Sequence, residues 1–293
     1  MPVSAREAGS RPAPRTDASG TTWRLVAGAI LLAAVGFAPI EAVAAGAEAV
    51  DRSALRVCAD PNNLPFSNDK GEGFENKIAE LLAQKLGVPV RYTWYPDSIG
   101  FIRNTLRARR CDLIIGTIAG NELLQNTNPY YRSAFSLVYR KNSGLALTRI
   151  DDSLKSLRIG AVAGTPPVNM LAQKGLLGSL HTYALVVDTR FDHPARDLVH
   201  DVATGDIDVG IVWGPVGGYF AKQEDTPLTV VPLRTENPAL RFDYRITMGV
   251  RYNEPEWKRQ INDLIRENQK EIEAILLEYG VPLLDEQANP TSP

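Results

Sequence analysis

The chain has 293 residues, of which 44% are apolar and 23% are charged, and its formal net charge is −2. This length is too great for one typical hydrophobic core and suits two. The near-neutral charge, with no dense basic run, gives no electrostatic reason to expect nucleic acid as a partner.

Residues 1–45 are predicted to be a secretory signal peptide, outside the fold. Arg24 precedes the apolar run 25–38, which is shorter than the about 20 residues that span a bilayer. Pro39 breaks this run, and the small residues Ala42–Ala45 resemble a cleavage site. An uncleaved membrane anchor is the alternative. Because no later segment is apolar enough to span a membrane, we expect an exported periplasmic protein with no stable membrane association.

Strands and helices alternate along the first part of the exported chain. Ile78, Leu81, Leu82 and Leu86 recur at helical spacing, and Gly87 ends that helix as a C-cap. Such alternation implies right-handed βαβ units and a parallel sheet. The predicted strands are Leu55–Asp60, Val88–Tyr95 and Leu113–Ile115, and the predicted helices are Phe74–Leu86 and Ile99–Ala108.

Two cysteines, Cys58 and Cys111, occur in the chain. An even cysteine count in an exported protein favours a disulfide. Cys58 lies inside the first predicted strand, and Cys111 directly precedes the apolar run Asp112–Gly116. If these strands are neighbours, the two Cα atoms lie within the about 4.4–6.8 Å that a disulfide requires. Two reduced, buried thiols are the alternative.

The alternation of strands and helices restarts after Ser133–Arg140. We expect this stretch to be an extended segment that crosses from the first group of elements to the second. A last strand, Tyr244–Arg251, and a long helix, about Glu256–Tyr279, have no place in this second group and are expected to return to the first. The second group has predicted strands at Arg158–Val162, His181–Val187, Ile207–Val212 and Leu228–Pro232, and predicted helices that open at Gly164–Pro167 or cover Pro194–Thr204 and Gly214–Lys222.

This order of elements predicts an α/β fold of two lobes. Lobe 1 comprises residues 53–140 plus 241–285, and lobe 2 comprises residues 144–236. Because the chain crosses between the lobes twice, we expect a hinge there and a central cleft between the lobes.

Six segments together resemble the family 3 periplasmic solute-binding proteins, which bind polar amino acids. The match covers about Ser53 to Asp285, and it implies the two-lobed type II periplasmic-binding-protein fold. The segments are RVCADPNNLPFSN, GEGFENKIAELLAQKLG, CDLIIG, NPYYRS, IGAVAGT and GDIDVGIVWGP.

The amino-acid site of that family is largely missing here. Asn63 stands where the family has a stacking aromatic ring, Leu124 where it has the arginine that binds the ligand carboxylate, and Trp213 where it has the aspartate that pairs with the ammonium. Only Gly164-Thr165 is retained. Since a missing partner in a buried charge pair costs about 2–5 kcal/mol, we predict that the chain does not bind free amino acids in the family's manner.

With these departures the chain resembles the accessory J proteins of bacterial methanol-oxidation clusters, the MxaJ and XoxJ type. The stretch Pro194–Pro215 carries the most specific part of this resemblance. It implies a periplasmic partner of a pyrroloquinoline-quinone (PQQ)-dependent methanol dehydrogenase, with the dehydrogenase's cytochrome c as a further candidate partner. The expected role is to aid maturation or activation of the enzyme through protein contact at the cleft. The alternative is an ABC-transporter-linked binding protein for a non-amino-acid ligand.

Ten residues at predicted strand ends and loops are expected to line the cleft. Trp213 is either a stacking wall or a core side chain, and at least one of Tyr130 and Tyr131 is expected to pack the crossing segment. Thr165 is a natural N-cap, and free amides beside it would attract a carboxylate, although a plain helix start explains it equally well. The ten are Asp60, Asn62, Asn63, Phe66, Trp94, Leu124, Tyr130, Gly164, Thr165 and Trp213.

No catalytic or metal pattern stands out. His193 and His200 are seven residues apart, with no HExxH motif and no nearby cysteine. We therefore expect a monomer that is not an enzyme and carries no cofactor or metal of its own. A dehydratase of the same fold is a third hypothesis, which would need a poised carboxylate or histidine in the cleft.

Overall fold

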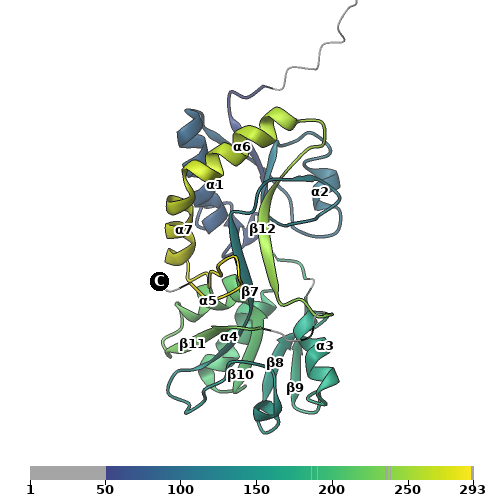
Figure 1. Ribbon diagram of the computed structural model, residues 1–293, viewed down its shortest axis with the longest axis vertical. Coiled ribbons are helices and arrows are strands. Elements are labelled where there is room, and N and C mark those ends of the chain that lie inside the picture. Colours follow the sequence, from purple (N-terminus) through teal and green to yellow (C-terminus); the bar gives the residue numbers. More distant parts are fainter. Residues whose placement is uncertain (1–50, 186, 190, 235–236, 238, 292–293) are drawn as a thin grey trace, which may run out of the picture. The chain divides into compact units, whose positions relative to one another are not determined.

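A mixed β-sheet runs through the part of the chain that the computed structural model describes, which is residues 51–185, 187–189, 191–234, 237 and 239–291. The predicted signal peptide lies outside the described residues. In sheet order the strands are β4 (Val90–Trp94), β1 (Leu55–Ala59), β5 (Leu113–Ile118), β12 (Asp243–Val250), β7 (Tyr131–Arg140), β10 (Val209–Trp213), β8 (Ile159–Val162) and β9 (Leu180–Tyr183), while β6 (Gln125–Asn126) pairs with β12 and β11 (Leu228–Pro232) with β7 (Figure 1).

Helices flank this sheet. Among the described residues, no helix has both the length and the apolar character needed to cross a membrane. The helices are α1 (Phe74–Leu86), α2 (Phe101–Asn104), α3 (Pro166–Gln173), α4 (Pro194–Thr204), α5 (Gly214–Ala221), α6 (Pro255–Glu267) and α7 (Gln269–Glu278), with a 3-10 turn at Asp152–Leu154 and a small hairpin of β2 (Asn62–Asn63) and β3 (Ser67–Asn68).

Two groups of elements carry separate cores. In lobe 1, helices α1, α6 and α7 pack fully buried side chains such as Ile78, Ile261 and Ile272 against β1, β5 and β12. In lobe 2, Leu198 of α4 and Ile159 of β8 anchor two further clusters. The described residues nevertheless form one compact unit. The lobe boundaries, 53–140 plus 241–285 and 144–236, therefore stay a prediction.

The predicted crossing segment is a strand that belongs to both groups. Tyr131–Ala134 of β7 pairs antiparallel with β12, and Phe135–Tyr139 pairs antiparallel with β10. Figure 1 shows β7 and β12 side by side between the two groups of helices. The prediction of a parallel sheet is therefore correct for β4, β1 and β5 and for β10, β8 and β9, but wrong for the centre, because β7 and β12 are themselves paired strands.

A side-chain hydrogen bond explains where α1 begins, and a glycine conformation explains where it ends. The Asn76 side chain accepts hydrogen bonds from Gly73 N and Asn68 N, both at 3.0 Å, which satisfies a free amide of the first helical turn. Gly87 adopts a left-handed conformation with φ of 67° and ends the helix, as predicted.

Two helix predictions are wrong. The long C-terminal helix divides at Asn268, whose side chain donates to Leu264 O at 2.8 Å and so competes with the helical backbone. The predicted helix Ile99–Ala108 shortens to α2, because Gly100 takes φ of 97° and Thr105 leaves the helical region at φ of −120°. As predicted, the C-terminal strand and helices return to the first lobe, where β12 pairs with β5.

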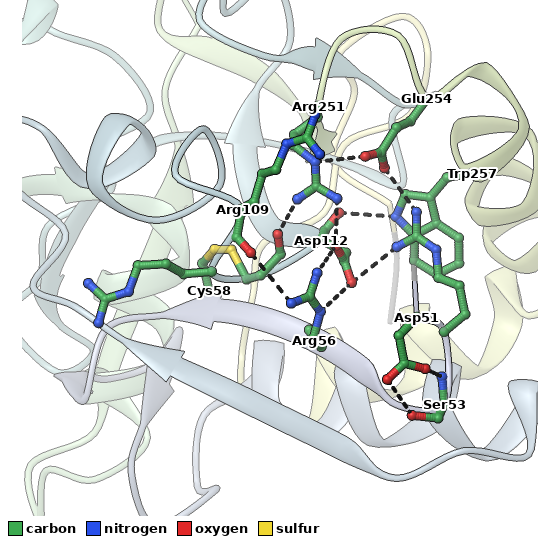
Figure 2. A network of polar contacts seen from close by, with 12 residues as sticks. Asp51, Ser53, Arg56, Cys58, Arg109, Asp112, Arg251, Glu254 and Trp257 are labelled. Carbon is green, nitrogen blue, oxygen red and sulfur yellow. Dashed lines mark hydrogen bonds and ion pairs between the residues drawn. A yellow bond between two sulfur atoms is a disulfide. The ribbon is translucent and has the colours of Figure 1, made fainter. Parts of the chain in front are cut away.

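The predicted disulfide joins β1 to the segment just before β5. Cys58 and Cys111 are bonded, and their Cα atoms lie 5.5 Å apart. Figure 2 shows this bond beside a network centred on Asp112, whose side chain is fully buried. Its carboxylate accepts from Arg56 Nη2 and Arg251 Nη2, both at 2.6 Å, and lies 3.1 Å from Arg52 Nη1.

Candidate functional site

The two groups of parallel strands direct their carboxyl ends to a shared edge. In open α/β sheets, ligands bind at the carboxyl ends of the strands. β4 and β1 end at Trp94 and Ala59 on one side of this edge, and β8 and β10 end at Val162 and Trp213 on the other. Asn62 Nδ2 donates to Thr189 O at 2.6 Å and so joins the loop after β1 to the loop after β9. We expect the predicted cleft at this edge.

Asp60 joins the loops at this edge. Its side chain is buried, and its carboxylate accepts from Asn62 N at 2.8 Å and Asp97 N at 2.6 Å. Thr189 Oγ1 lies 3.3 Å from the same carboxylate. Since three segments use its oxygens, Asp60 acts here as a positioning residue rather than as a free ligand group.

Two aromatic side chains lie between the lobes. Phe66 and Trp213 are half-buried, and each packs against core clusters of both lobes. Phe66 meets Phe74 edge-on at 5.4 Å, and Trp213 meets Phe135 at 5.5 Å and Tyr244 at 5.8 Å. Trp213 is thus a packed side chain that contacts the cores of both lobes, and its role as a stacking wall of the cleft stays a prediction.

The start of α3 differs from a simple anion site. Thr165 is the N-cap, as predicted, but its hydroxyl donates to Val162 O at 2.7 Å and caps no helical amide. Pro166 and Pro167, the first two helical residues, have no backbone N–H. Gly164, at φ of 75°, lies next to Leu185. This end of α3 therefore offers fewer amides to a carboxylate than its sequence indicates.

Two of the expected cleft residues lie inside lobe 1. Leu124 is 1% exposed and packs in the cluster that contains the disulfide. It is drawn inward because β6, which follows it, pairs with β12. Tyr130 is also 1% exposed, since its ring packs edge-on against Tyr131 at 5.0 Å. Neither residue lines the cleft surface.

Asn63 and Trp94 stand at the margins of the site. Asn63 is half-buried in the β2–β3 hairpin. Trp94 stacks on Tyr92 at 4.4 Å and packs against the core cluster of α1. Both lie close in sequence to Asp60 and Asp97, the acidic groups of this edge.

Sequence reasoning missed two carboxyl groups at this edge. Glu75, in the first turn of α1, is partly buried, and burial followed by the charge of Asp97 raises its pKa well above the ordinary value. Burial followed by the charge of Asp60 raises the pKa of Asp97 to about 6. An acidic residue at a helix start normally indicates only a favourable helix dipole, so nothing local distinguishes Glu75.

Two surface hollows and one histidine pair lie away from the expected site residues. Surface hollows beside Trp257 and beside Tyr183 include none of the ten expected residues. His200 lies 3.2 Å from Glu224 on an exposed surface. No group of three or more histidine, cysteine, aspartate or glutamate side chains among the described residues is arranged to hold a metal ion.

The sequence profile of the bacterial extracellular solute-binding proteins, family 3, matches residues 55–281. The chain belongs to this family. Its similarity to solved members confirms the predicted two-lobed α/β fold, and its relatives confirm the predicted resemblance to the MxaJ and XoxJ type.

Three proteins illustrate the similarity. The chain is 47% identical to the periplasmic binding protein XoxJ from Methylobacterium extorquens AM1, with a TM-score of 0.68 over 79% of this chain and 100% of that one. It is 25% identical to MxaJ from Methlophaga aminisulfidivorans MPT, with a TM-score of 0.68 over 78% of this chain and 100% of that one. It is 32% identical to protein MoxJ from Methylorubrum extorquens, over 92% of this chain and 96% of that protein.

Proposed function

We propose that this chain is a periplasmic, non-catalytic accessory protein of methanol oxidation. In this proposal it acts on a PQQ-dependent methanol dehydrogenase and aids the enzyme's maturation or activation through protein contact at the cleft. One observation carries the proposal, which is the 47% identity to XoxJ over the full length of that protein.

The cleft chemistry supports a partner other than a free amino acid. A zwitterion needs a cation for its carboxylate and an anion for its ammonium. Here Trp213 occupies the position of the family's ammonium partner, and Leu124 is buried in the core. The apolar faces of Phe66 and Trp213 suit a polypeptide segment, because aromatic anchors supply much of the binding free energy at protein interfaces.

The contacts between the lobes suggest how such a segment gains access. Three polar contacts to Thr189, from Asn62 and Asp60, join the loops at the cleft edge. Net contributions of single hydrogen bonds to stability are about 0.5–1.5 kcal/mol, so a partner with greater affinity for an open form can shift the population toward it. Opening would expose Phe66 and Trp213.

The test is complex formation between the exported chain and its organism's methanol dehydrogenase. We expect Phe66→Ala and Trp213→Ala each to weaken the complex by about 30-fold, the loss for an interfacial hot spot of about 2 kcal/mol. Tyr252→Ala is the matched control, because Tyr252 is 56% exposed and belongs to neither core cluster at the cleft. Circular dichroism checks that each variant is folded, and Trp213→Phe keeps an aromatic ring if Trp213→Ala does not fold.

Equal affinities for the wild type, the cleft variants and the control would place the contact elsewhere. If no complex forms and one small compound raises the melting temperature instead, the transporter-linked binding protein becomes the better account. Ligand binding to the folded state stabilises it by RT ln(1 + [L]/Kd).

A further inference from the structure

Lobe 1 carries an excess of arginine on the segment that follows β4. Between Ser98 and Cys111 the sequence has four arginines and no acidic residue, although the formal net charge of the whole chain is −2. The four are Arg103, Arg107, Arg109 and Arg110. Asp112 comes shortly after them, but its buried carboxylate is paired with Arg56 and Arg251. The positive charge of the segment is therefore not neutralised by its neighbours in the sequence.

Burial of the apolar side chains of this segment leaves its arginines on the surface. Phe101 and Leu106 are 7% and 0% exposed, and both pack in the cluster that contains the disulfide. Thr105 Oγ1 donates to Phe101 O at 2.6 Å, and Arg110 N donates to Thr105 O at 3.1 Å. The segment is thus a compact, anchored turn, and its four arginines are exposed.

Three of these arginines have no acidic partner. Within the described residues, Arg103, Arg107 and Arg110 form no ion pair with a carboxylate. By contrast, the exposed Arg259 and Arg266 of α6 are each paired with a carboxylate of their own helix. A guanidinium group without such a partner keeps its donors for an external group, and its planar fork matches a carboxylate.

An apolar side chain lies beside this charge. Ile99 is 93% exposed. The Arg103 guanidinium lies over Gly100, since a Cβ on this glycine would be 3.3 Å from Arg103 Nη2. Arginine around an exposed apolar side chain is typical of protein interfaces, in which an apolar centre has a polar rim. We call this surface the arginine face, and it comprises Ile99, Arg103, Arg107 and Arg110.

The arginine face adjoins the edge at which we expect the cleft. Asp97 N donates to the Asp60 carboxylate at that edge, and Ile99 follows two residues later, within about 7 Å along the chain. Figure 1 shows α2 on the right of lobe 1, away from α1 and α7. A partner whose segment enters the cleft would therefore bring its own surface over the arginine face.

We propose that the arginine face docks an acidic protein surface on the partner that the cleft serves. The proposal rests on the proposed function, because it names the chemistry of that partner outside the cleft. Its arginines pair with aspartate and glutamate side chains, which steers association, and Ile99 packs on an apolar patch between them. A membrane fits less well, because α2 has four residues and the apolar side chains of the segment are buried, which leaves no apolar helix face to insert.

The first experiment measures binding of a glutamate decamer to the exported chain by isothermal titration calorimetry. We expect the double variant Arg103→Gln with Arg107→Gln to bind about tenfold more weakly at about 20 mM salt, and the difference to fall below about threefold at about 500 mM, because salt screens exposed charges. Arg259→Gln with Arg266→Gln is the matched control, since it removes two exposed arginines from α6.

A second arm measures the complex with the dehydrogenase in the same variants, and we expect the same dependence on salt. Ile99→Ser is expected to weaken this complex by about threefold at both salt concentrations, because apolar packing is not screened. Leu177→Ser is its control, since Leu177 is 50% exposed and lies in lobe 2.

Equal affinities of the double variant and its control in both arms would overturn the arginine face. If decamer binding depends on the face and the dehydrogenase complex does not, the assignment to the enzyme's surface is wrong. If decamer binding depends on the face but the wild type forms no complex, the face stands and the proposed function fails. Arginine-dependent binding to phosphatidylglycerol vesicles, with no loss in the other two arms, would overturn the protein assignment in favour of a membrane.

Discussion

Asp112 shows how one buried carboxylate can hold distant parts of a chain. It contacts Arg52 before β1, Arg56 in β1 and Arg251 after β12, and its carbonyl oxygen accepts from Trp257 Nε1 at 3.0 Å (Figure 2). Burial alone would raise the pKa of Asp112, but the hydrogen bonds from Arg56 and Arg251 hold it below the ordinary value. The folded state therefore favours the ionised form of the Asp112 side chain.

Asp112→Asn is expected to lower the free energy of unfolding by about 3–5 kcal/mol, the cost of removing one partner of a buried ion pair. Because the folded-state pKa is depressed, this stabilisation is present above about pH 4 and is lost as pH falls further. Urea unfolding at neutral and acidic pH measures both effects. Asp152→Asn, which removes an exposed pair with Lys155, is the control. Equal losses in the two variants would contradict the account.

The ionisation of Asp97 is expected to change the stability of the fold in the direction opposite to that of Asp112. Its pKa is raised to about 6, so the folded state binds the proton more tightly than the unfolded state does. Its ionised form therefore destabilises the fold above about pH 6, and this cost disappears below the ordinary pKa of about 3.9. We expect Asp97→Asn to raise the melting temperature at about pH 8 more than at about pH 4. The same change at both pH values would show that the raised pKa has no part in it.

At the scale of elements, the disulfide ties β1 to the start of β5 across a sequence separation of 53 residues. Replacing both cysteines by alanine is expected to lower the free energy of unfolding by about 2–5 kcal/mol, chiefly because the unfolded chain gains freedom. Chemical unfolding of the reduced wild type should give a similar loss. A loss below about 1 kcal/mol in both would show that the neighbouring Asp112 network already supplies the constraint.

Elements with local start and stop signals were predictable from the sequence. The bounds of α4, Pro194–Thr204, agree with the prediction because a proline opens the helix and Gly205 ends it at φ of 90°. The division of the last helix at Asn268 was not predictable, since its apolar spacing continues through that residue. The inward position of Leu124 depends on pairing between β6 and β12, which no local pattern encodes.

The candidate site could be predicted from the sequence only in part. Strand ends and the loop after β1 indicate Asp60, Phe66 and Trp213 as cleft residues, and this assignment stays a prediction. Glu75 and Asp97 were missed because their importance comes from burial and from each other's charge, across segments that meet only in the folded chain. Thr189 was missed because loop residues contact Asp60 without any sequence signal.

At the scale of the whole molecule, two sets of contacts link the two lobes. Asn62 and Asp60 meet Thr189 at the cleft edge, while the end of α7 contacts α5 through Tyr279, which stacks on Tyr219 at 5.7 Å. Lys222 Nζ also donates to Glu278 O at 2.7 Å. Together with β7, which pairs with strands of both groups, these contacts join the two lobes.

The central claim is that this family 3 protein serves a methanol dehydrogenase rather than a small solute. Size-exclusion chromatography of the exported chain with its organism's methanol dehydrogenase, in metal-free and metal-loaded forms, tests it most directly. The account predicts a complex that is stronger with the metal-free form and is weakened by Phe66→Ala but not by Tyr252→Ala. Separate elution of the two proteins with both forms of the enzyme would contradict it.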